Sequence, residues 1–326
     1  MAPSDTRSGA DAPTTPAQAL GVATALFERL HADGIAYCLW KSNEHLSAAM
    51  TGATDLDVLV DRDAALRMGG LLSELGYKRV TATPRHAYAG IEDYLALDRP
   101  TGRLAHLHLH YQLTLGEKNV KGYRLPWEDL VLDSRVLNRE YGVFTTEPTL
   151  ELVLLVVRSA LRLRTRDMVS GNREAPAFRD AGRREFEWLV AQTDQARVRE
   201  LTERLLGPAA AAALAAMLHR PPTIGSLYAF RRLILPAFAD FRIYGRLRAL
   251  RYRWSRELAL RWEKARRRLL GFPRPYKHTL PRGGLIVVFV GCDGSGKSTV
   301  TREITRWLSW KLDVAQLYFG SGNGPA

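Results

Sequence analysis

The sequence predicts a multidomain protein of mixed α/β and α+β class, and three observations support this prediction. Strand-like and helix-like segments alternate over residues 18–145, and helical periodicity dominates over residues 146–223. Near the C-terminus, an apolar run directly before a glycine-rich loop is typical of the start of a parallel sheet. The 326 residues are 46% hydrophobic and 25% charged. The chain is therefore long enough for several domains with cores of their own.

Residues 1–17 are rich in Pro, Ala, Ser and Thr, and they lack the cationic start and apolar core of a signal peptide. We expect a disordered tail there and a cytoplasmic protein. The two cysteines, Cys38 and Cys292, lie far apart without metal-ligand spacing around either, so neither a disulfide framework nor a zinc site is expected. No run of 18 apolar residues is free of charge, so no membrane span is expected.

Residues 18–145 are expected to form an α+β domain. The predicted helices are 18–32 and 63–75, and the predicted strands are 35–40, 55–60, 91–97 and 104–111. Thr146 and Pro148 then supply a cap and a first-turn proline for a helix through 151–163. Helices are expected from there to about His219, which places a helical domain at residues 146–223.

Residues 224–281 are expected to form a basic amphipathic helix followed by a linker, GFPRPYKHTLPRGG, that breaks it. Residues 228–270 contain 13 Lys and Arg against 3 Asp and Glu, a net of +10 out of the chain's +13. Apolar residues recur there every three or four positions, which predicts one stripe on a long helix. The stripe consists of Ile243, Leu247, Leu250, Trp254, Leu258, Trp262, Ala265 and Leu269.

Three interpretations of this basic helix stay open. The stripe packs on the helical or C-terminal section while the arginines reach water, or the helix attaches to an anionic membrane surface. The third interpretation is a surface that binds nucleic acid or a protein partner. Membrane attachment ranks ahead of nucleic-acid binding because the predicted helix is long, continuous and rich in Trp. The sequence does not indicate an oligomeric state.

Residues 291–299, GCDGSGKST, have the pattern of a loop that binds the phosphates of a nucleoside triphosphate. The apolar run LIVVFV at 285–290 predicts a buried parallel strand before the loop, and the residues after it have helical spacing, so a chance match to the pattern is disfavoured. Three glycines let successive backbone N–H groups point at one anion beside a helix N-terminus. The predicted nucleotide-binding residues are Gly291, Asp293, Gly294, Ser295, Gly296, Lys297, Ser298 and Thr299.

The expected cofactors of this loop are ATP and Mg²⁺. Lys297 is expected to reach the β- and γ-phosphates, Ser298 to ligate Mg²⁺, and Thr299 to support the α-phosphate side. The run VFVGCDGSGKST, with Asp293 and Gly294 inside the loop, resembles the opening of thymidylate kinases and related nucleoside-monophosphate kinases. The resemblance implies a P-loop kinase fold and transfer of the γ-phosphoryl group of ATP to an acceptor, with Lys297 as a catalytic residue.

The resemblance to these kinases covers residues 282–326 and has departures. Family members usually have Glu before the first glycine, where this chain has Val290. The Walker B carboxylate, the Asp-Arg substrate motif and the arginine-bearing lid of the family have no counterpart in the sequence. We therefore expect the N-terminal part of a kinase domain, which binds nucleotide without turnover.

Asp55 and Asp57 lie two residues apart in a predicted strand, so both point to one face and can hold Mg²⁺ as a catalytic metal. Together with the turn Lys41-Ser42-Asn43, they resemble the nucleotidyltransferase superfamily, whose members pair a Gly-Ser-type turn with Asp-x-Asp. The likeness is greatest to a group with a Lys near this turn and an Ile-Asp-Leu-His-Trp strand, for which this chain offers LHLHY at 107–111.

This second resemblance places His108 where the family has its third carboxylate, with His106 and His110 on the same face. Histidine is a poor ligand for Mg²⁺, so the site is either a nucleotidyltransferase acting through Asp55 and Asp57 or a degenerate binding site. In a further hypothesis, both nucleotide sites are sensors on a non-catalytic peripheral scaffold. The structural alternatives are a polar strand edge for the two aspartates and a solvated face for the histidines.

Overall fold

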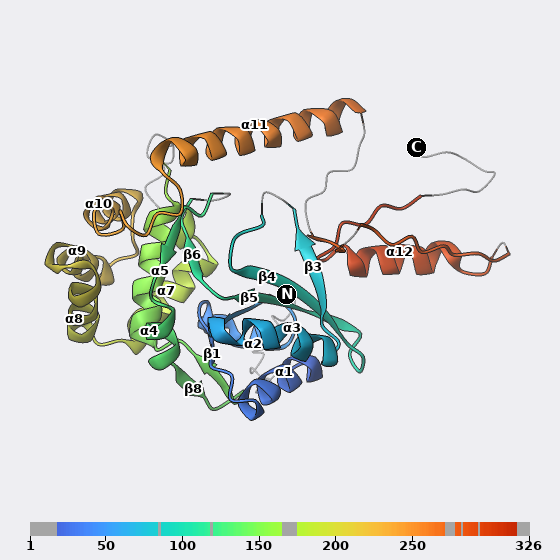
Figure 1. The fold of residues 1–326 in the computed structure, drawn as a ribbon, viewed down its shortest axis with the longest axis horizontal. Coiled ribbons are helices and arrows are strands. Elements are labelled where there is room, and N and C mark those ends of the chain that lie inside the picture. Colours follow the sequence, from blue (N-terminus) through green and yellow to red (C-terminus); the bar gives the residue numbers. More distant parts are fainter. Residues whose placement is uncertain are drawn as a thin grey trace, which may run out of the picture.

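The computed structural model describes residues 18–83, 86–117, 120–164, 175–270, 278–281, 283–292 and 294–317. These residues form a large mixed sheet with helices around it, which confirms the α/β class (Figure 1). No helix in this part of the chain is both long and apolar enough to cross a membrane. The predicted tail, residues 1–17, lies outside the described residues.

Eight strands form the main sheet in the order β10-β3-β4-β5-β2-β1-β9-β8. They are β1 (Tyr37–Leu39), β2 (Leu56–Val60), β3 (Lys78–Ala82), β4 (Ile91–Asp98), β5 (Arg103–His110), β8 (Val136–Asn138), β9 (Val143–Thr145) and β10 (His278–Thr279). Strand β2 runs parallel to β5 and β1 runs parallel to β9, whereas all other neighbours are antiparallel. A small separate sheet pairs β6 (Leu113–Leu115) with β7 (Tyr123–Leu125). The four predicted strands of the N-terminal domain are therefore confirmed as β1, β2, β4 and β5.

The predicted helices of the N-terminal and middle regions are also present. The helices are α1 (Gly21–Ala32), α2 (Leu46–Met50), α3 (Ala65–Glu74), α4 (Glu128–Asp133), α5 (Pro148–Arg162), α7 (Ala181–Gln192), α8 (Gln195–Leu206), α9 (Pro208–Leu218), α10 (Ile224–Ile234), α11 (Arg246–Leu270) and α12 (Lys297–Leu308). Pro148 is the first residue of α5, as predicted, but the cap is Glu147 instead of Thr146. The Glu147 carboxylate accepts the backbone N–H of Leu150 at 3.0 Å, because a longer side chain reaches the orphan donor from this position.

The alternation of side chains along the strands gives the sheet two different faces. On one face, Leu56, Val58 and Val60 of β2 and Ala105, Leu107 and Leu109 of β5 pack in a core with α1, α2 and α3. On the other face, Cys38, Trp40 and Leu59 join the core around α5. Residues of β2 and β5 that alternate with the first set, including Asp57 and His108, project toward this second face.

Helix α5 is the centre of the helical region, since all but three of its 15 residues are buried. It packs with α7, α8, α9 and α10 in one continuous hydrophobic core. Residues 224–234, which the sequence assigned to the basic segment, form α10, and Leu227, Phe230 and Ile234 are part of this core. The basic helix itself is α11, which begins at Arg246.

The apolar stripe of α11 faces away from the rest of the protein. Trp254 and Trp262 are 53% and 66% exposed, so the stripe does not pack on the described part of the chain, and the packing interpretation is wrong there. Charged residues beside the stripe carry contacts with the body: Arg253 pairs with Glu117, and Glu257 pairs with Arg164 at 2.9 Å. The helix is thus held by ion pairs along one flank of the stripe.

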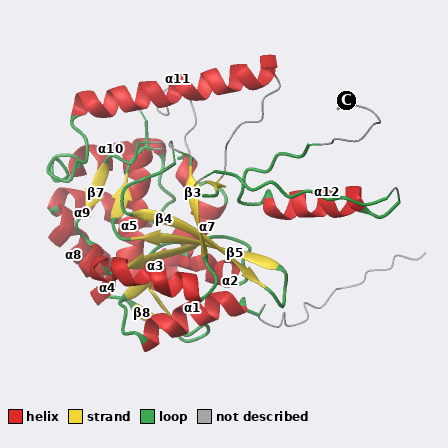
Figure 2. Ribbon diagram, turned by 45° about the vertical axis from the view of Figure 1, so that its right-hand side comes forward, coloured by secondary structure: helices red, strands yellow, loops and turns green. Residues whose placement is uncertain are grey.

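The strand predicted at 285–290 does not form. These six apolar residues have no ladder partner among the described residues and are exposed, from 36% at Phe289 to 88% at Ile286. A strand needs a hydrogen-bonded neighbour, and apolar periodicity in one segment does not supply it. The following helix, α12, forms as predicted but buries none of its residues, and it projects away from the sheet in both ribbon views (Figure 1, Figure 2).

Candidate metal and nucleotide sites

The register of three strands brings acidic and imidazole side chains together. In the parallel pair β2–β5, Asp57 lies beside His108, and in the antiparallel pair β4–β5, Asp93 lies on the other side of His108. Directly opposite residues project from the same face with Cβ atoms about 5 Å apart. His108 is therefore flanked by two carboxylates on the face of the sheet away from α1 and α3.

His108 contacts both of these carboxylates. Its Nδ1 atom lies 3.4 Å from Asp57 Oδ1, and its Nε2 atom lies 2.6 Å from Asp93 Oδ1. Burial disfavours the imidazolium, but the two carboxylates outweigh burial and raise the pKa of His108 to about 9. At neutral pH, His108 is thus a cation between two anions in the metal-free protein.

His106 and His278 complete the group around Asp93. His106 is almost fully buried, with Nδ1 2.9 Å from Asp55 Oδ1 and Nε2 3.4 Å from Asp93 Oδ1. His278 reaches the same carboxylate from β10, with Nε2 3.5 Å from Asp93 Oδ2. The edge strand β10, which pairs with β3, therefore adds a fourth side chain to the group. His278 lies 168 positions after His110, the last histidine of β5, in the sequence.

His110, the third histidine of β5, has a different environment. Its Nε2 atom lies 3.3 Å from Asp57 Oδ1, but burial dominates and lowers the pKa of His110 to about 3. The predicted row of three histidines on one face is therefore confirmed as geometry. Its members differ in charge, because His108 has two acidic neighbours and His110 is buried beside one.

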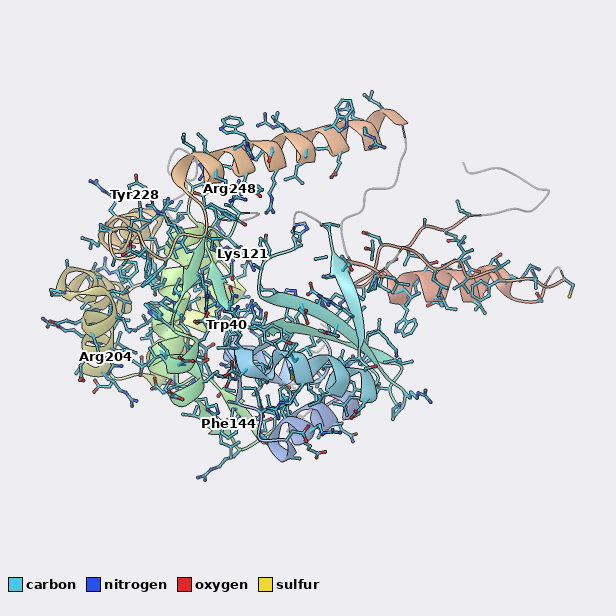
Figure 3. All side chains as sticks on the ribbon, in the orientation of Figure 1. Trp40, Lys121, Phe144, Arg204, Tyr228 and Arg248 are labelled. Atoms are coloured by element: carbon cyan, nitrogen blue, oxygen red, sulfur yellow. The ribbon has the colours of Figure 1, made fainter. Side chains whose placement is uncertain are left out.

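Lysines balance the acidic side chains. Lys41 Nζ lies 2.9 Å from Asp57 Oδ1, and Lys311 pairs with Asp55. Lys121 lies near the same cluster, and burial together with the charge of Lys41 lowers its pKa to about 8. Figure 3 shows Lys121 and Trp40 near the junction of the sheet and the helical region. Although burial raises the pKa of Asp55 and Asp57, these cations and the imidazoles hold both well below the ordinary value.

The turn Lys41-Ser42-Asn43 is fixed by α5. Ser42 has a φ of 63°, in the left-handed region, and Asn43 begins a 3₁₀ turn. The Asn43 backbone N–H and side-chain amide donate to the two carboxylate oxygens of Glu151, at 3.0 and 2.7 Å. Burial outweighs these hydrogen bonds and raises the pKa of Glu151 to about 7.

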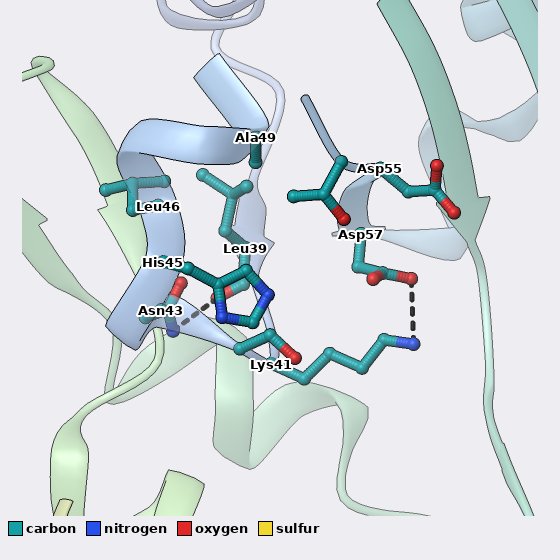
Figure 4. Close-up of a pocket in the computed structure, with 10 residues that line it drawn as sticks. Leu39, Lys41, Asn43, His45, Leu46, Ala49, Asp55 and Asp57 are labelled. Atoms are coloured by element: carbon teal, nitrogen blue, oxygen red, sulfur yellow. Dashed lines mark hydrogen bonds and ion pairs between the residues drawn. The ribbon is translucent and has the colours of Figure 1, made fainter. Parts of the chain in front are cut away.

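A small pocket lies between this turn, helix α2 and the beginning of β2 (Figure 4). Its volume is about 110 Å³, and its lining includes Lys41, Asn43, Asp55 and Asp57. At about 30 Å³ per water molecule, it accommodates a few waters or one phosphate group. In Figure 4, the Lys41 side chain extends along the lining residues and its ammonium pairs with the Asp57 carboxylate.

Two groups of side chains in the described part of the chain could hold a metal ion. One is Asp93, His106, His108 and His278, and the other is Asp57, His108 and His110. The predicted Mg²⁺ pair, Asp55 and Asp57, occurs together in neither group. Each of these carboxylates is bound to its own lysine and imidazoles, and their imidazole partners are poor ligands for a hard cation.

In the C-terminal loop, the structure confirms the helix predicted after the glycines, and phosphate binding stays a prediction. Gly294 and Gly296 have φ values of 80° and 82°, which non-glycine residues rarely adopt, and α12 begins at Lys297. Lys297 Nζ donates to the carbonyl oxygens of Gly291 and Cys292 at 2.6 and 2.5 Å. Ser298 and Thr299 lie exposed in the first turn of α12, and Asp293 lies outside the described residues.

Sequence reasoning missed four contributors to the N-terminal cluster: Asp93, Glu151, His278 and Lys311. For Asp93 a clue was present, because the turn after Asp98 pairs it with Arg103 and this register places Asp93 opposite His108. For Glu151 the signal was that it is the single acidic residue in the apolar helix predicted at 151–163. No local pattern identifies His278 or Lys311, since both reach the sheet through long-range contacts.

Comparison of the chain with protein-family models, with curated proteins and with solved structures found no match.

Proposed function

We propose that this chain binds ATP with Mg²⁺ at residues 291–299 and belongs to a P-loop kinase of the thymidylate-kinase type, which transfers the γ-phosphoryl group to an acceptor. The observation that carries the proposal is the position of Lys297. Its ammonium lies folded over the loop at the N-terminus of α12, and its hydrogen bonds among the described residues go to the neutral carbonyls of Gly291 and Cys292. The proposal places the protein in the cytoplasm, where ATP is available.

The loop provides three kinds of group for a triphosphate. Backbone N–H groups at the start of α12 point out of the helix and favour an anion. Lys297 exchanges two neutral carbonyl partners for phosphate oxygens, which form stronger, charge-assisted hydrogen bonds. The Ser298 hydroxyl is the ligand for Mg²⁺, and Thr299 supports the α-phosphate side.

The test is calorimetry of ATP and ATPγS binding in the presence of Mg²⁺. Replacing Lys297 by Ala removes a charge-assisted contact worth about 2–3 kcal/mol, so the affinity should fall by about 100-fold. Lys264→Ala, at an exposed lysine of α11, is the matched control and should bind as the wild type does. Equal affinity of wild type and Lys297→Ala would refute the proposed site.

The alternative function is metal-dependent nucleotidyl transfer at the N-terminal site, through Asp55 and Asp57. The pocket beside the turn at Ser42 favours it, because Lys41 and the two aspartates line one cavity of about 110 Å³. The double variant Asp55→Ala/Asp57→Ala separates the two functions in the same calorimetric experiment. If this variant alone loses nucleotide binding, the N-terminal domain holds the functional site and the P-loop proposal fails.

We also propose that α11 attaches the protein to an anionic membrane surface. Its apolar stripe, with Trp254 and Trp262, faces outward, and arginines flank it. Sedimentation with vesicles rich in phosphatidylserine should show binding that weakens with salt and is lost in Trp254→Ala/Trp262→Ala. Neutral vesicles are the control, and binding to RNA or DNA in place of vesicles would favour a nucleic-acid surface. The remaining hypothesis is a non-catalytic scaffold with two sensor sites. It is favoured if binding to vesicles or another partner is retained when Lys297 or the two aspartates are replaced.

A further inference from the structure

We propose that a divalent transition-metal ion of the zinc class binds between side chains that converge from β4, β5 and the edge strand β10. Its four ligands are Asp93, His106, His108 and His278. This site differs from the Mg²⁺ sites considered above, and it does not depend on nucleotide binding by the C-terminal loop. The cysteines gave no reason to expect zinc, whereas the fold assembles imidazoles from two distant segments.

The ligand atoms of the four side chains converge on the Asp93 carboxylate. One ligand atom from each residue lies within 4.8 Å of all the others. His106 and Asp93 are 1% and 7% exposed. Asp93 Oδ1 and His106 Nε2 are buried atoms that contact each other at 3.4 Å without a hydrogen bond of acceptable geometry. Buried polar atoms that lack a well-formed hydrogen bond are costly, and a bound cation would satisfy both of them.

Each imidazole is oriented by a separate acceptor at Nδ1. His106 Nδ1 lies 2.9 Å from Asp55 Oδ1, and His278 Nδ1 lies 3.2 Å from the backbone carbonyl of Lys311. A carbonyl only accepts, so the Nδ1 atom of His278 is the donor in this contact, and Nε2 is the ring atom that faces Asp93. Histidines that ligate metals commonly donate their other N–H to a carboxylate or a carbonyl in this way.

His108 follows the same arrangement, with Nδ1 facing Asp57 and Nε2 facing Asp93. All three imidazoles therefore turn Nε2 toward one point and Nδ1 toward an acceptor. In this arrangement Asp55 and Asp57 are positioning residues for the histidines, and they need not touch the metal. This positioning role accounts for the contact of Asp55 with His106 and for that of Asp57 with His108.

The ligand set selects the class of metal. Three imidazole nitrogens and one carboxylate oxygen suit Zn²⁺ and similar ions, whereas Mg²⁺ and Ca²⁺ prefer oxygen ligands. Zn²⁺ distances of about 2.0–2.2 Å place tetrahedral ligand atoms about 3.3 Å apart. Asp93 oxygens lie 3.4 Å from His106 Nε2 and 3.5 Å from His278 Nε2, close to this spacing. The separation of 2.6 Å from His108 must open, which a rotation of the carboxylate permits.

The other candidate group, Asp57 with His108 and His110, fits less well. It has three ligands instead of four, and it shares His108 with the first group. His110 Nε2 already faces Asp57, and its Nδ1 atom is buried without a hydrogen bond, so nothing fixes the orientation that a ligand needs. We therefore assign the ion to the four-residue group.

The test measures Zn²⁺ binding by the full chain after removal of metal with a chelator. Titration in competition with a chromogenic chelator should show one equivalent of Zn²⁺. His278→Ala removes a ligand from a two-residue edge strand, so the fold should persist while the affinity falls by about 10-fold or more. His219→Ala, at an exposed histidine after α9, is the control and should bind as the wild type does.

Two further measurements keep the proposal open to refutation. The visible absorption of the Co²⁺-loaded protein should have the intensity of four-coordinate geometry, and His108→Ala should reduce it. Mg²⁺ should not compete with Zn²⁺ at comparable concentration. The proposal is overturned if Zn²⁺ binding is absent, or if His278→Ala and His108→Ala bind Zn²⁺ as tightly as the wild type does, in proteins whose circular dichroism is unchanged.

Discussion

The two candidate sites of this protein differ in how their geometry is held. The N-terminal cluster is built on the register of β2, β4 and β5, and its His106 and Asp93 are buried. The C-terminal loop precedes a helix with no buried residue, and the run before it is exposed. The first site depends on long-range packing, whereas the second depends on glycine conformations and a helix N-terminus within one short segment.

This difference teaches that a local sequence motif and a packed scaffold are separate properties. Gly294 and Gly296 of the loop have left-handed backbone conformations and α12 follows them, even though the neighbouring strand is not formed. The sheet cluster has a packed scaffold, but its chemistry departs from the expected pair of Mg²⁺ ligands. Changes to buried residues should therefore affect the two regions unequally.

The largest expected effect comes from a matched pair of truncations, one in each region. Leu107→Ala, under the histidines of β5, removes a fully buried side chain and should lower the free energy of unfolding by about 3 kcal/mol. Val288→Ala, in the exposed run, should change it by less than about 0.5 kcal/mol. Urea unfolding followed by circular dichroism measures both, and similar losses in the two variants would show that the C-terminal segment is packed in solution.

A second effect, of at most about 3 kcal/mol, concerns the pH dependence of stability through Glu151. Burial raises its pKa in the folded protein from 4.5 to about 7, so the folded state binds this proton more tightly than the unfolded state does. The proton bound to Glu151 therefore contributes fully to the free energy of unfolding below pH 4.5, and this contribution is lost as the pH rises to about 7. The Glu151→Gln variant has no ionisable group at this position, so its stability lacks this pH dependence.

Unfolding experiments at several pH values between 4.5 and 8 should therefore show a steeper loss of stability in the wild type than in Glu151→Gln. Glu187→Gln, at an exposed glutamate of α7, is the control and should keep the wild-type slope. Parallel pH profiles for the wild type and Glu151→Gln would mean that Glu151 is ionised with an ordinary pKa.

The smallest expected effect concerns the contact between the two regions. Lys311 pairs with Asp55, and its partly exposed position limits the effect of Lys311→Ala on global stability to about 1 kcal/mol or less. The same substitution should accelerate chymotryptic cleavage after Trp307 and Trp310, because the segment is held to the sheet by few other contacts. Arg306→Ala, which loses only the local pair with Glu303, should be cleaved at the wild-type rate.

The two helices and four strands that the sequence predicted in the N-terminal region are present, because period-two and helical patterns are local. The shorter elements α2, α4 and β6 to β9 and the strand β3 were not predicted. The sequence also predicted that Asp55 and Asp57, and separately the three histidines of β5, share a face. The hairpin register that places Asp93 opposite His108 was not used, and the neighbours of β2 could not be predicted, so the partners of the two aspartates were unknown. The prediction of a strand at 285–290 was wrong for a related reason, because an apolar pattern within one segment does not indicate whether a second strand is available to pair with it.

The edge strand β10 gives the proposed metal site a thermodynamic consequence. His278 precedes the P-loop in the chain, and its backbone also bonds to residues 311 and 313. An ion held jointly by β10 and the central strands is a reversible cross-link that closes a loop of about 170 residues between His108 and His278. By linkage, metal affinity and docking of β10 strengthen each other by the same factor. Zinc availability would then set how often the C-terminal segment is docked.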